Sequence, residues 1–344
     1  MAVTIIFAIL MFSLIIFVHE LGHFICARIF GVKVHEFAIG MGPAIFSKQR
    51  GETKYSVRAI PVGGFCSMEG EDCESGDEGS FSAKPWYARL VILAAGAGMN
   101  VILGFLVCLI FVAATSSGGI AGTQVDSVME QSDLADFLRE GDRIVSINGT
   151  RVHIKRDIDF AMQQNGGAKF DIVIKRGSEK LSGTFSPYEA KYTDGTPAYL
   201  IGFTPKIENA NPVTVVREAF FQTVWMGKLV FVSLGMLLRG QAKVSEVSGP
   251  VGVVGAMNTT ARTGGFVSLI YLAAFISVNI GLMNLLPIPA LDGGRIFFVL
   301  VEALRRKPIP PEREGLVHFV GLILLMAVMV LATWNDILKL INGG

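Results

Sequence analysis

The sequence predicts a polytopic α-helical membrane protein with four transmembrane helices, a membrane-associated β-hairpin and an inserted α+β domain. Of its 344 residues, 51% are hydrophobic and 17% are charged, which is an apolar composition for a soluble protein. Several apolar segments are long enough to cross a bilayer, whose hydrocarbon core requires about 20 helical residues. A polar stretch in the middle of the chain instead shows short strands and turns, as expected of one modest soluble domain.

These patterns divide the chain into four parts. The first and last parts are each predicted to contain two membrane spans, and the soluble domain and a linking segment lie between them. The parts are residues 1–115, 116–206, 207–262 and 263–344. The predicted spans are residues 3–30, 86–114, 266–286 and 315–334.

A β-hairpin is predicted between the first two spans. Residues 53–60 alternate apolar with polar side chains, and Tyr55 and Val57 are among the apolar ones. Glycines, including Gly40 and Gly42, interrupt any helix in this region. We interpret residues 53–60 as an edge strand near the first helix, since a sheet edge that lines a cavity can pair with an extended substrate. A surface loop is the alternative.

The inserted domain, residues 116–206, is predicted to contain short strands, a helix over residues 157–164 and a tight turn at Asn148-Gly149. Residues 141–149 have the sequence Gly-Asp-Arg-Ile-Val-Ser-Ile-Asn-Gly, and this run closely resembles the PDZ family. The resemblance implies one PDZ domain, which could bind a peptide C-terminus by strand addition. A spacer or size filter is the alternative.

The segment of residues 212–238 is apolar, but it carries Arg217, Glu218 and Lys228. It could span the membrane, yet these charges favour an amphipathic helix that lies on the membrane surface. We therefore do not count it among the four predicted spans.

The first span contains the sequence His-Glu-Leu-Gly-His at residues 19–23. Residues four apart share one face of a helix, so His19 and His23 can present two imidazoles to one zinc ion. Glu20 can then take a proton from a water at the ion. Polar groups in an apolar segment are costly in lipid, so a functional role is the favoured interpretation. An accidental match on a core helix is the alternative.

Asp292 is the candidate for a third ligand. It follows the third span, in a stretch at residues 287–294 with the sequence Pro-Ile-Pro-Ala-Leu-Asp-Gly-Gly. Irregular backbone at membrane depth is tolerated only where it lines a cavity or is buried in protein. Two histidines and one carboxylate leave the fourth zinc position open, which is the catalytic arrangement. The alternative is an aspartate that caps the start of a helix.

Together these motifs resemble the site-2 intramembrane metalloproteases, and most closely the bacterial regulator of sigma-E protease group. The matching features are residues 19–23, Gly-Met-Gly at residues 40–42, one PDZ domain, and Asn-Leu-Leu-Pro-Ile-Pro-Ala-Leu-Asp-Gly-Gly at residues 284–294. The resemblance implies that a peptide bond is hydrolysed within the transmembrane segment of a single-pass membrane protein. The expected substrates are a trimmed anti-sigma factor or a signal-peptide remnant.

The resemblance also implies roles for individual residues. His19, His23 and Asp292 are expected to bind zinc, and Glu20 is expected to act as general base. The asparagines are expected to hold the unwound substrate or its oxyanion, and the hairpin is expected to pair with the substrate strand. The substrate-binding residues so implied are Asn284, Asn279, Gly40, Gly42, Tyr55 and Val57.

Basic residues predict the orientation in the membrane. The connections from the first to the second span and from the third to the fourth are rich in Lys and Arg, so both are predicted to be cytoplasmic. The PDZ domain and both termini then lie outside the cytoplasm, in a multi-pass protein of a bacterial inner membrane. The net charge of +1 gives no basic face for nucleic acid. The expected partners are the lipid bilayer and a membrane-protein substrate.

The competing hypothesis is a non-catalytic membrane scaffold or transporter that binds a metal. It accounts for the polar residues in the apolar segments, but not for a glutamate between the two histidines. A third hypothesis, an adaptor with a PDZ domain and an accidental motif, leaves Asp292 unexplained.

Overall fold

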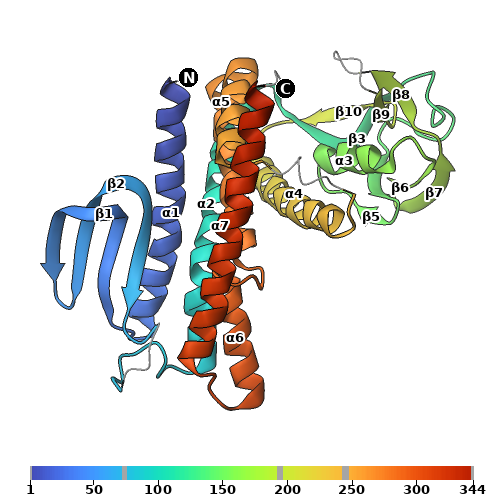
Figure 1. Ribbon diagram of the computed structural model, residues 1–344. Coiled ribbons are helices and arrows are strands. Elements are labelled where there is room, and N and C mark those ends of the chain that lie inside the picture. Colours follow the sequence, from blue (N-terminus) through green and yellow to red (C-terminus); the bar gives the residue numbers. More distant parts are fainter. Residues whose placement is uncertain (1, 72–75, 192–196, 242–247, 342–344) are drawn as a thin grey trace. The chain divides into compact units, whose positions relative to one another are not determined.

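The computed structural model describes residues 2–71, 76–191, 197–241 and 248–341 (Figure 1). The chain divides into two compact units. One comprises Met1–Val107 and Met226–Gly344, and the other comprises Cys108–Trp225. The first unit contains the β-hairpin and most of the long apolar helices, and the second contains the inserted domain.

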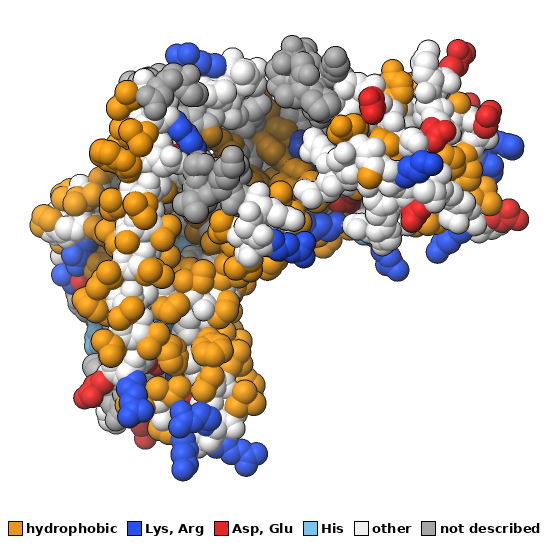
Figure 2. All heavy atoms as spheres, turned by 45° about the vertical axis from the view of Figure 1, so that its right-hand side comes forward, with side chains coloured by type: hydrophobic (Ala, Val, Ile, Leu, Met, Phe, Trp, Pro, Cys, Tyr) orange, Lys and Arg blue, Asp and Glu red, His pale blue; other side chains and the backbone are white. Residues whose placement is uncertain are grey.

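Among the described residues, five helices are long and apolar enough to cross a membrane. They are α1 (Ala2–Ile29), α2 (Trp86–Thr115), α4 (Pro212–Leu238), α5 (Pro250–Asn284) and α7 (Pro311–Ile341). Hydrophobic side chains cover the surface of the long helices in Figure 2, as contact with lipid requires. The predicted number of four spans is not confirmed, because α4 also has the length and composition of a span.

The polypeptide between α5 and α7 forms a tight turn and then a helix, α6 (Asp292–Arg305), that we did not predict. Two glycines make this turn possible. A Cβ at Gly293 would lie 2.1 Å from the Leu286 carbonyl oxygen, and one at Gly294 would lie 2.6 Å from that of Ile288. Because α6 begins at Asp292, the carboxylate stands at a helix N-terminus.

The predicted hairpin is confirmed, and its two strands are β1 (Val34–Arg50) and β2 (Thr53–Met68). Each strand bends near its middle, so the sheet contains four paired segments and packs against α1 (Figure 1). Residues 34–39 pair with residues 64–68 and also with residues 54–57, which in turn pair with residues 46–50. The alternative of a surface loop is therefore wrong.

Our prediction that residues 53–60 form an edge strand is also wrong. Residues 54–57 have a paired neighbour on each side. The outer segments of the sheet are residues 46–50 and residues 64–68. A backbone that is paired on both sides has no free N–H and C=O groups for a further strand.

The inserted domain is built on one antiparallel sheet with the order β10-β3-β4-β6-β7, and short β5 pairs with β4. A helix, α3 (Lys155–Asn165), covers it with Ile158 and Met162 in the core. The strands are β3 (Ile120–Val128), β4 (Arg143–Ile147), β5 (Thr150–Arg151), β6 (Phe170–Arg176), β7 (Glu179–Phe185) and β10 (Phe203–Glu208). A short helix, η1 (Ser116–Gly118), precedes β3, and β8 (Tyr188–Lys191) pairs with β9 (Pro197–Leu200).

The predicted helix and turn of this domain are confirmed. The turn residues Asn148 and Gly149 have φ values of +48° and +75°, as a two-residue hairpin turn requires. The compact unit also includes the first half of α4. Within it, the His153 ring stacks on Phe221 at a centroid distance of 4.2 Å, and the Phe160 ring meets Trp225 edge-on.

Candidate metal centre and active site

Three potential metal ligands converge in the first unit. His19 and His23 lie one turn apart on α1, and Asp292 reaches them from the first residue of α6. The two Nε2 atoms are 3.2 Å apart. The Asp292 Oδ2 atom is 3.1 Å from Nε2 of His19 and 3.4 Å from Nε2 of His23. Asp292 is the first residue of α6, but the N-cap is Leu291 and no side chain caps the helix, so the alternative of a capping aspartate is wrong. The carboxylate instead faces both histidines.

The donor set fits a zinc ion. Ligand atoms about 2.0–2.1 Å from a tetrahedral ion lie about 3.3 Å from one another, close to the three separations given above. The Asp292 Oδ2 atom is buried and has no hydrogen-bond partner, although two ring nitrogens face it. A carboxylate oxygen and two imidazole lone pairs repel one another unless a cation lies between them. The described residues therefore form a site that a cation completes.

Hydrogen bonds on the far side of each ring fix the histidine orientations. The Nδ1 atom of His23 donates to the Ile92 carbonyl oxygen at 2.8 Å, which leaves Nε2 free to bind a metal. The Nδ1 atom of His19 is 3.3 Å from Nδ2 of Asn100, a fully buried residue of α2 whose Oδ1 has no partner. Turning this amide by 180° makes Oδ1 the acceptor for an Nδ1–H of His19, the arrangement that zinc binding by Nε2 requires.

Asn100 joins α2 to α1 through its contact with His19. Its role at the metal centre was not predicted. The available signal was an asparagine in the apolar second span, since a polar residue at membrane depth indicates a functional site.

The α1–α2 packing that places His23 depends on a glycine. A Cβ at Gly96 of α2 would lie 2.3 Å from Nε2 of His23, inside the van der Waals contact distance. Any side chain at this position would displace the imidazole. Gly98, two residues further along α2, has open space instead.

Glu20 lies beside the metal ligands and beside the sheet. Its carboxylate accepts a hydrogen bond from the backbone N–H of Cys66, in the outer segment formed by residues 64–68. A Cβ at Gly64 would lie 3.6 Å from Cγ of Glu20. Glu20, the three ligands and this segment line one cavity of about 400 Å³. Glu20, the three potential metal ligands and an outer sheet segment therefore share one space.

The residues that were predicted to bind substrate do not line this cavity. The Asn279 amide donates to the Phe275 carbonyl oxygen of its own helix at 2.9 Å, and Asn284 is the last residue of α5. Gly40 and Gly42 have φ values of +85° and +83° and form the bend of β1.

Tyr55 and Val57 lie in the segment that is paired on both sides, and the Tyr55 ring packs on Phe24 and Phe37. The substrate-binding roles of Asn284, Asn279, Gly40, Gly42, Tyr55 and Val57 stay predictions. For Tyr55 and Val57, such a role requires side-chain contacts, because their backbone already has partners.

Known proteins are similar in sequence to nearly the whole chain. The family model for peptidase family M50 matches residues 7–328. A putative zinc metalloprotease of Clostridium acetobutylicum is 38% identical over 98% of this chain and 98% of that protein. The regulator of sigma-W protease RasP of Bacillus subtilis is 31% identical over 98% of this chain and 99% of that protein. The PDZ domain of an SdrC-like protein from Listeria monocytogenes is 29% identical over 25% of this chain and 87% of that structure, with a TM-score of 0.21.

A site of two histidines, a carboxylate and an adjacent glutamate, set among membrane-length helices, defines an intramembrane zinc metalloprotease. The chain belongs to peptidase family M50, the site-2 protease family. It is a bacterial membrane protein, as its relatives and its apolar helices indicate.

Proposed function

We propose that this protease hydrolyses a peptide bond within the transmembrane segment of single-pass membrane proteins. The preferred substrate is an anti-sigma factor that another protease has already trimmed, and signal-peptide remnants are the second class. The name of the Bacillus subtilis relative, a regulator of sigma-W protease, supports the first class.

One observation carries this proposal: the Glu20 carboxylate and the metal ligands share a cavity with the outer sheet segment of residues 64–68. A transmembrane helix hides its amides in hydrogen bonds, so it must unwind before any peptide bond can react. An outer segment offers backbone N–H and C=O groups that an extended substrate can pair with. Pairing there would lay the unwound chain beside Glu20.

The proposed chemical roles follow from the positions of the side chains. His19, His23 and Asp292 would hold zinc. The Nδ1 atom of each histidine, on the side of the ring away from the zinc, would be held by a hydrogen bond to the protein. When bound, zinc would polarise the scissile carbonyl and lower the pKa of water toward neutrality. Glu20 would take the proton from the attacking water and pass it to the leaving amine.

We further propose that the α1–α2 and α6–α7 connections are cytoplasmic. Lys and Arg side chains gather at one end of the long helices in Figure 2, which supports this orientation. The PDZ-like inserted domain and both termini would then lie outside the cytoplasm, where the domain would bind a peptide C-terminus or exclude untrimmed substrates. Labelling of single engineered cysteines by an impermeant reagent in intact cells tests this, and label reaching the hairpin but not the inserted domain would contradict it.

The decisive experiment compares cleavage of a model single-span substrate by the wild type, Glu20→Gln and Asp292→Ala, with zinc measured on each purified protein. Glu20→Gln is expected to keep zinc and lose cleavage, because it removes a proton acceptor but no ligand. Asp292→Ala is expected to lose both. Zinc loss from Glu20→Gln would contradict the assigned roles, and zinc binding without cleavage of any substrate would favour the metal-binding scaffold.

A further inference from the structure

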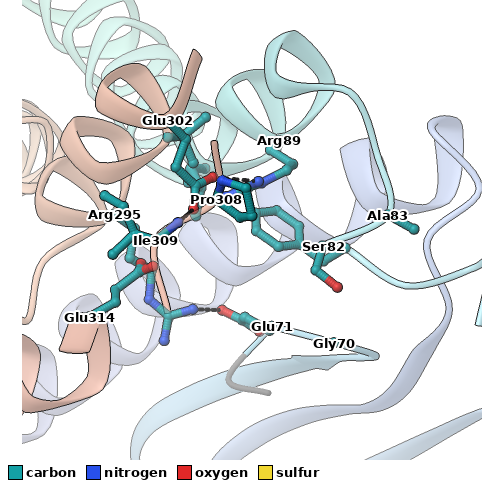
Figure 3. A pocket seen from close by; sticks show the side chains of 13 residues that line it. Gly70, Glu71, Ser82, Ala83, Arg89, Arg295, Glu302, Pro308, Ile309 and Glu314 are labelled. Carbon is teal, nitrogen blue, oxygen red and sulfur yellow. Dashed lines mark hydrogen bonds and ion pairs between the residues drawn. The ribbon is translucent and has the colours of Figure 1, made fainter. Parts of the chain in front are cut away.

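Ion pairs join α6, the helix that begins with Asp292, to its neighbours, and Figure 3 shows them in the wall of a polar cavity of about 320 Å³. Arg295 of α6 pairs at 2.5 Å with Glu71, which lies three residues beyond the end of β2. Glu302 of α6 pairs at 2.8 Å with Arg89, in the first turn of α2. Glu71 and Arg295 each interact with a further group as well, so the Arg89–Glu302 pair is the simpler one to test.

The Arg89–Glu302 pair is largely buried, and the two side chains are 16% and 11% exposed. Both carboxylate oxygens of Glu302 are bound, because Oε2 faces Nη1 of Arg89 and Oε1 accepts the backbone N–H of Ile309 at 2.8 Å. The Arg89 guanidinium also lies over the Phe81 ring, 5.4 Å from its centre. The distance and the direction between the two charged groups are therefore closely fixed.

Apolar side chains of α2 and α6 also pack against each other. Val299 of α6 lies in one buried cluster with Ile92 and Leu93 of α2, and Ile296 packs against this cluster. Apolar contact is non-directional, so it favours burial without fixing how far one helix slides along the other. A buried ion pair adds little net stability, because desolvation offsets its attraction, but its geometry can specify register. The ion pair is therefore suited to set the position of α6 along α2.

The helix α2 also orients both histidines of the candidate metal centre, through the Ile92 carbonyl oxygen and the Asn100 amide. Arg89 precedes Ile92 by one turn of the same helix. One helix can therefore fix the two imidazoles directly and, through the Arg89–Glu302 pair, the helix that begins with Asp292. It would serve as the common frame for all three potential ligands.

A small movement of α6 would disturb the site. Glu302 lies ten residues after Asp292 on this helix, which is about 15 Å along the axis at a rise of about 1.5 Å per residue. A slide by one residue at Glu302 would shift the Asp292 carboxylate by about 1.5 Å, because hydrogen bonds along the helix transmit the movement. Metal sites tolerate changes of only about 0.2 Å in their ligand distances. The register of α6 therefore bears directly on metal binding.

We propose that Arg89 and Glu302 are positioning residues for the metal centre. Their ion pair sets the register of α6 on α2 and so places the Asp292 carboxylate against His19 and His23. The inference rests on the proposed function, in which these three side chains bind zinc. It adds that zinc affinity depends on two residues outside the ligand set.

The test compares zinc affinity and stability in the full-length protein, purified in detergent. Glu302→Gln breaks the arrangement, because a glutamine has one acceptor oxygen and can serve Arg89 or Ile309 but not both. Arg89→Met removes the cation and keeps an apolar stem. Each single variant is expected to bind zinc roughly tenfold more weakly than the wild type, measured by competition with a chelator.

The double variant, Arg89→Met with Glu302→Gln, separates register from stability. It leaves neither charge of the pair buried without its partner, so its metal-free form is expected to unfold at nearly the wild-type temperature. Its zinc affinity is expected to stay roughly tenfold below that of the wild type, because the contact that sets the register is gone. The visible spectrum of Co²⁺ bound in place of zinc is expected to change too, since it reports ligand geometry. A pair that only stabilised the fold would leave both the affinity and the spectrum unchanged.

Arg305→Gln is the matched control, because Arg305 is exposed at the end of the same helix. Wild-type zinc affinity in the double variant, or an equal loss in Arg305→Gln, would overturn the positioning role alone. Wild-type zinc affinity in Asp292→Ala would instead contradict the proposed function, and the positioning role with it, because zinc would then not be bound by these ligands.

Discussion

Replacing Asn100 is the sharpest probe of the candidate metal centre, because this side chain contacts the proposed ligand His19 and is not itself a proposed ligand. Asn100→Leu keeps the approximate volume of the side chain and removes the partner of Nδ1 of His19, which lies 3.3 Å away. The residue is fully buried, so water cannot replace the lost hydrogen bond. The ring would then be free to turn or to change tautomer.

The magnitude follows from this geometry. An unpaired buried N–H costs about 1–3 kcal/mol, and loss of a partner behind a metal-binding histidine weakens metal binding by roughly 10- to 100-fold. These two figures agree, since a tenfold change in affinity corresponds to about 1.4 kcal/mol. We therefore expect Asn100→Leu to weaken zinc binding by roughly 10- to 100-fold, with the helices still folded.

The assay is competition for zinc between the purified protein in detergent and a chelator of known affinity. Asn100→Asp should retain zinc, because a carboxylate accepts from Nδ1–H at least as well as an amide does. Asn279→Leu is the matched control, since the Asn279 amide bonds within its own helix. Wild-type zinc affinity in Asn100→Leu, or an equal loss in Asn279→Leu, would refute the reasoning.

Two further predictions concern packing and charge. Gly96→Ala should abolish zinc binding, because the new Cβ would lie 2.3 Å from Nε2 of His23, whereas Gly98→Ala, in open space, should bind zinc normally in the same assay. In the inserted domain, the Arg176 guanidinium lowers the pKa of the buried Asp142 carboxyl below its usual value. Ionised Asp142 therefore stabilises the domain above about pH 4, and this contribution is lost as pH falls through the lowered pKa. Arg176→Gln should destabilise the domain at neutral pH and do so less in acid, as limited proteolysis across pH would detect. An equal loss at every pH would contradict this.

The three candidate metal ligands could be predicted from the sequence because single side chains carry their chemistry. His19 and His23 are four residues apart, and helical geometry alone places them on one face. Asp292 could be predicted because a carboxylate in an irregular, apolar stretch requires a partner. The three residues do come together, although α6 itself was not predicted.

Asn100 could not be assigned to the metal centre from the sequence. It contacts His19, which lies on another helix and is 81 residues away in the chain. Which residues meet across such a pair depends on the rotation of each helix about its axis, and an apolar span has no polar face to indicate that rotation. The close approaches at Gly22 of α1 and Gly96 of α2 fix it.

The error about the edge strand has a similar physical origin. Alternation over residues 53–60 correctly indicates a strand, but it reports the two faces of a sheet and not its two edges. Whether a strand is an edge depends on pairing with residues far away in the chain. Here the bends at Gly40 and Gly42 let residues 34–39 lie between residues 54–57 and residues 64–68. The edge that reaches Glu20 is therefore the segment after the second bend, which the alternating pattern does not include.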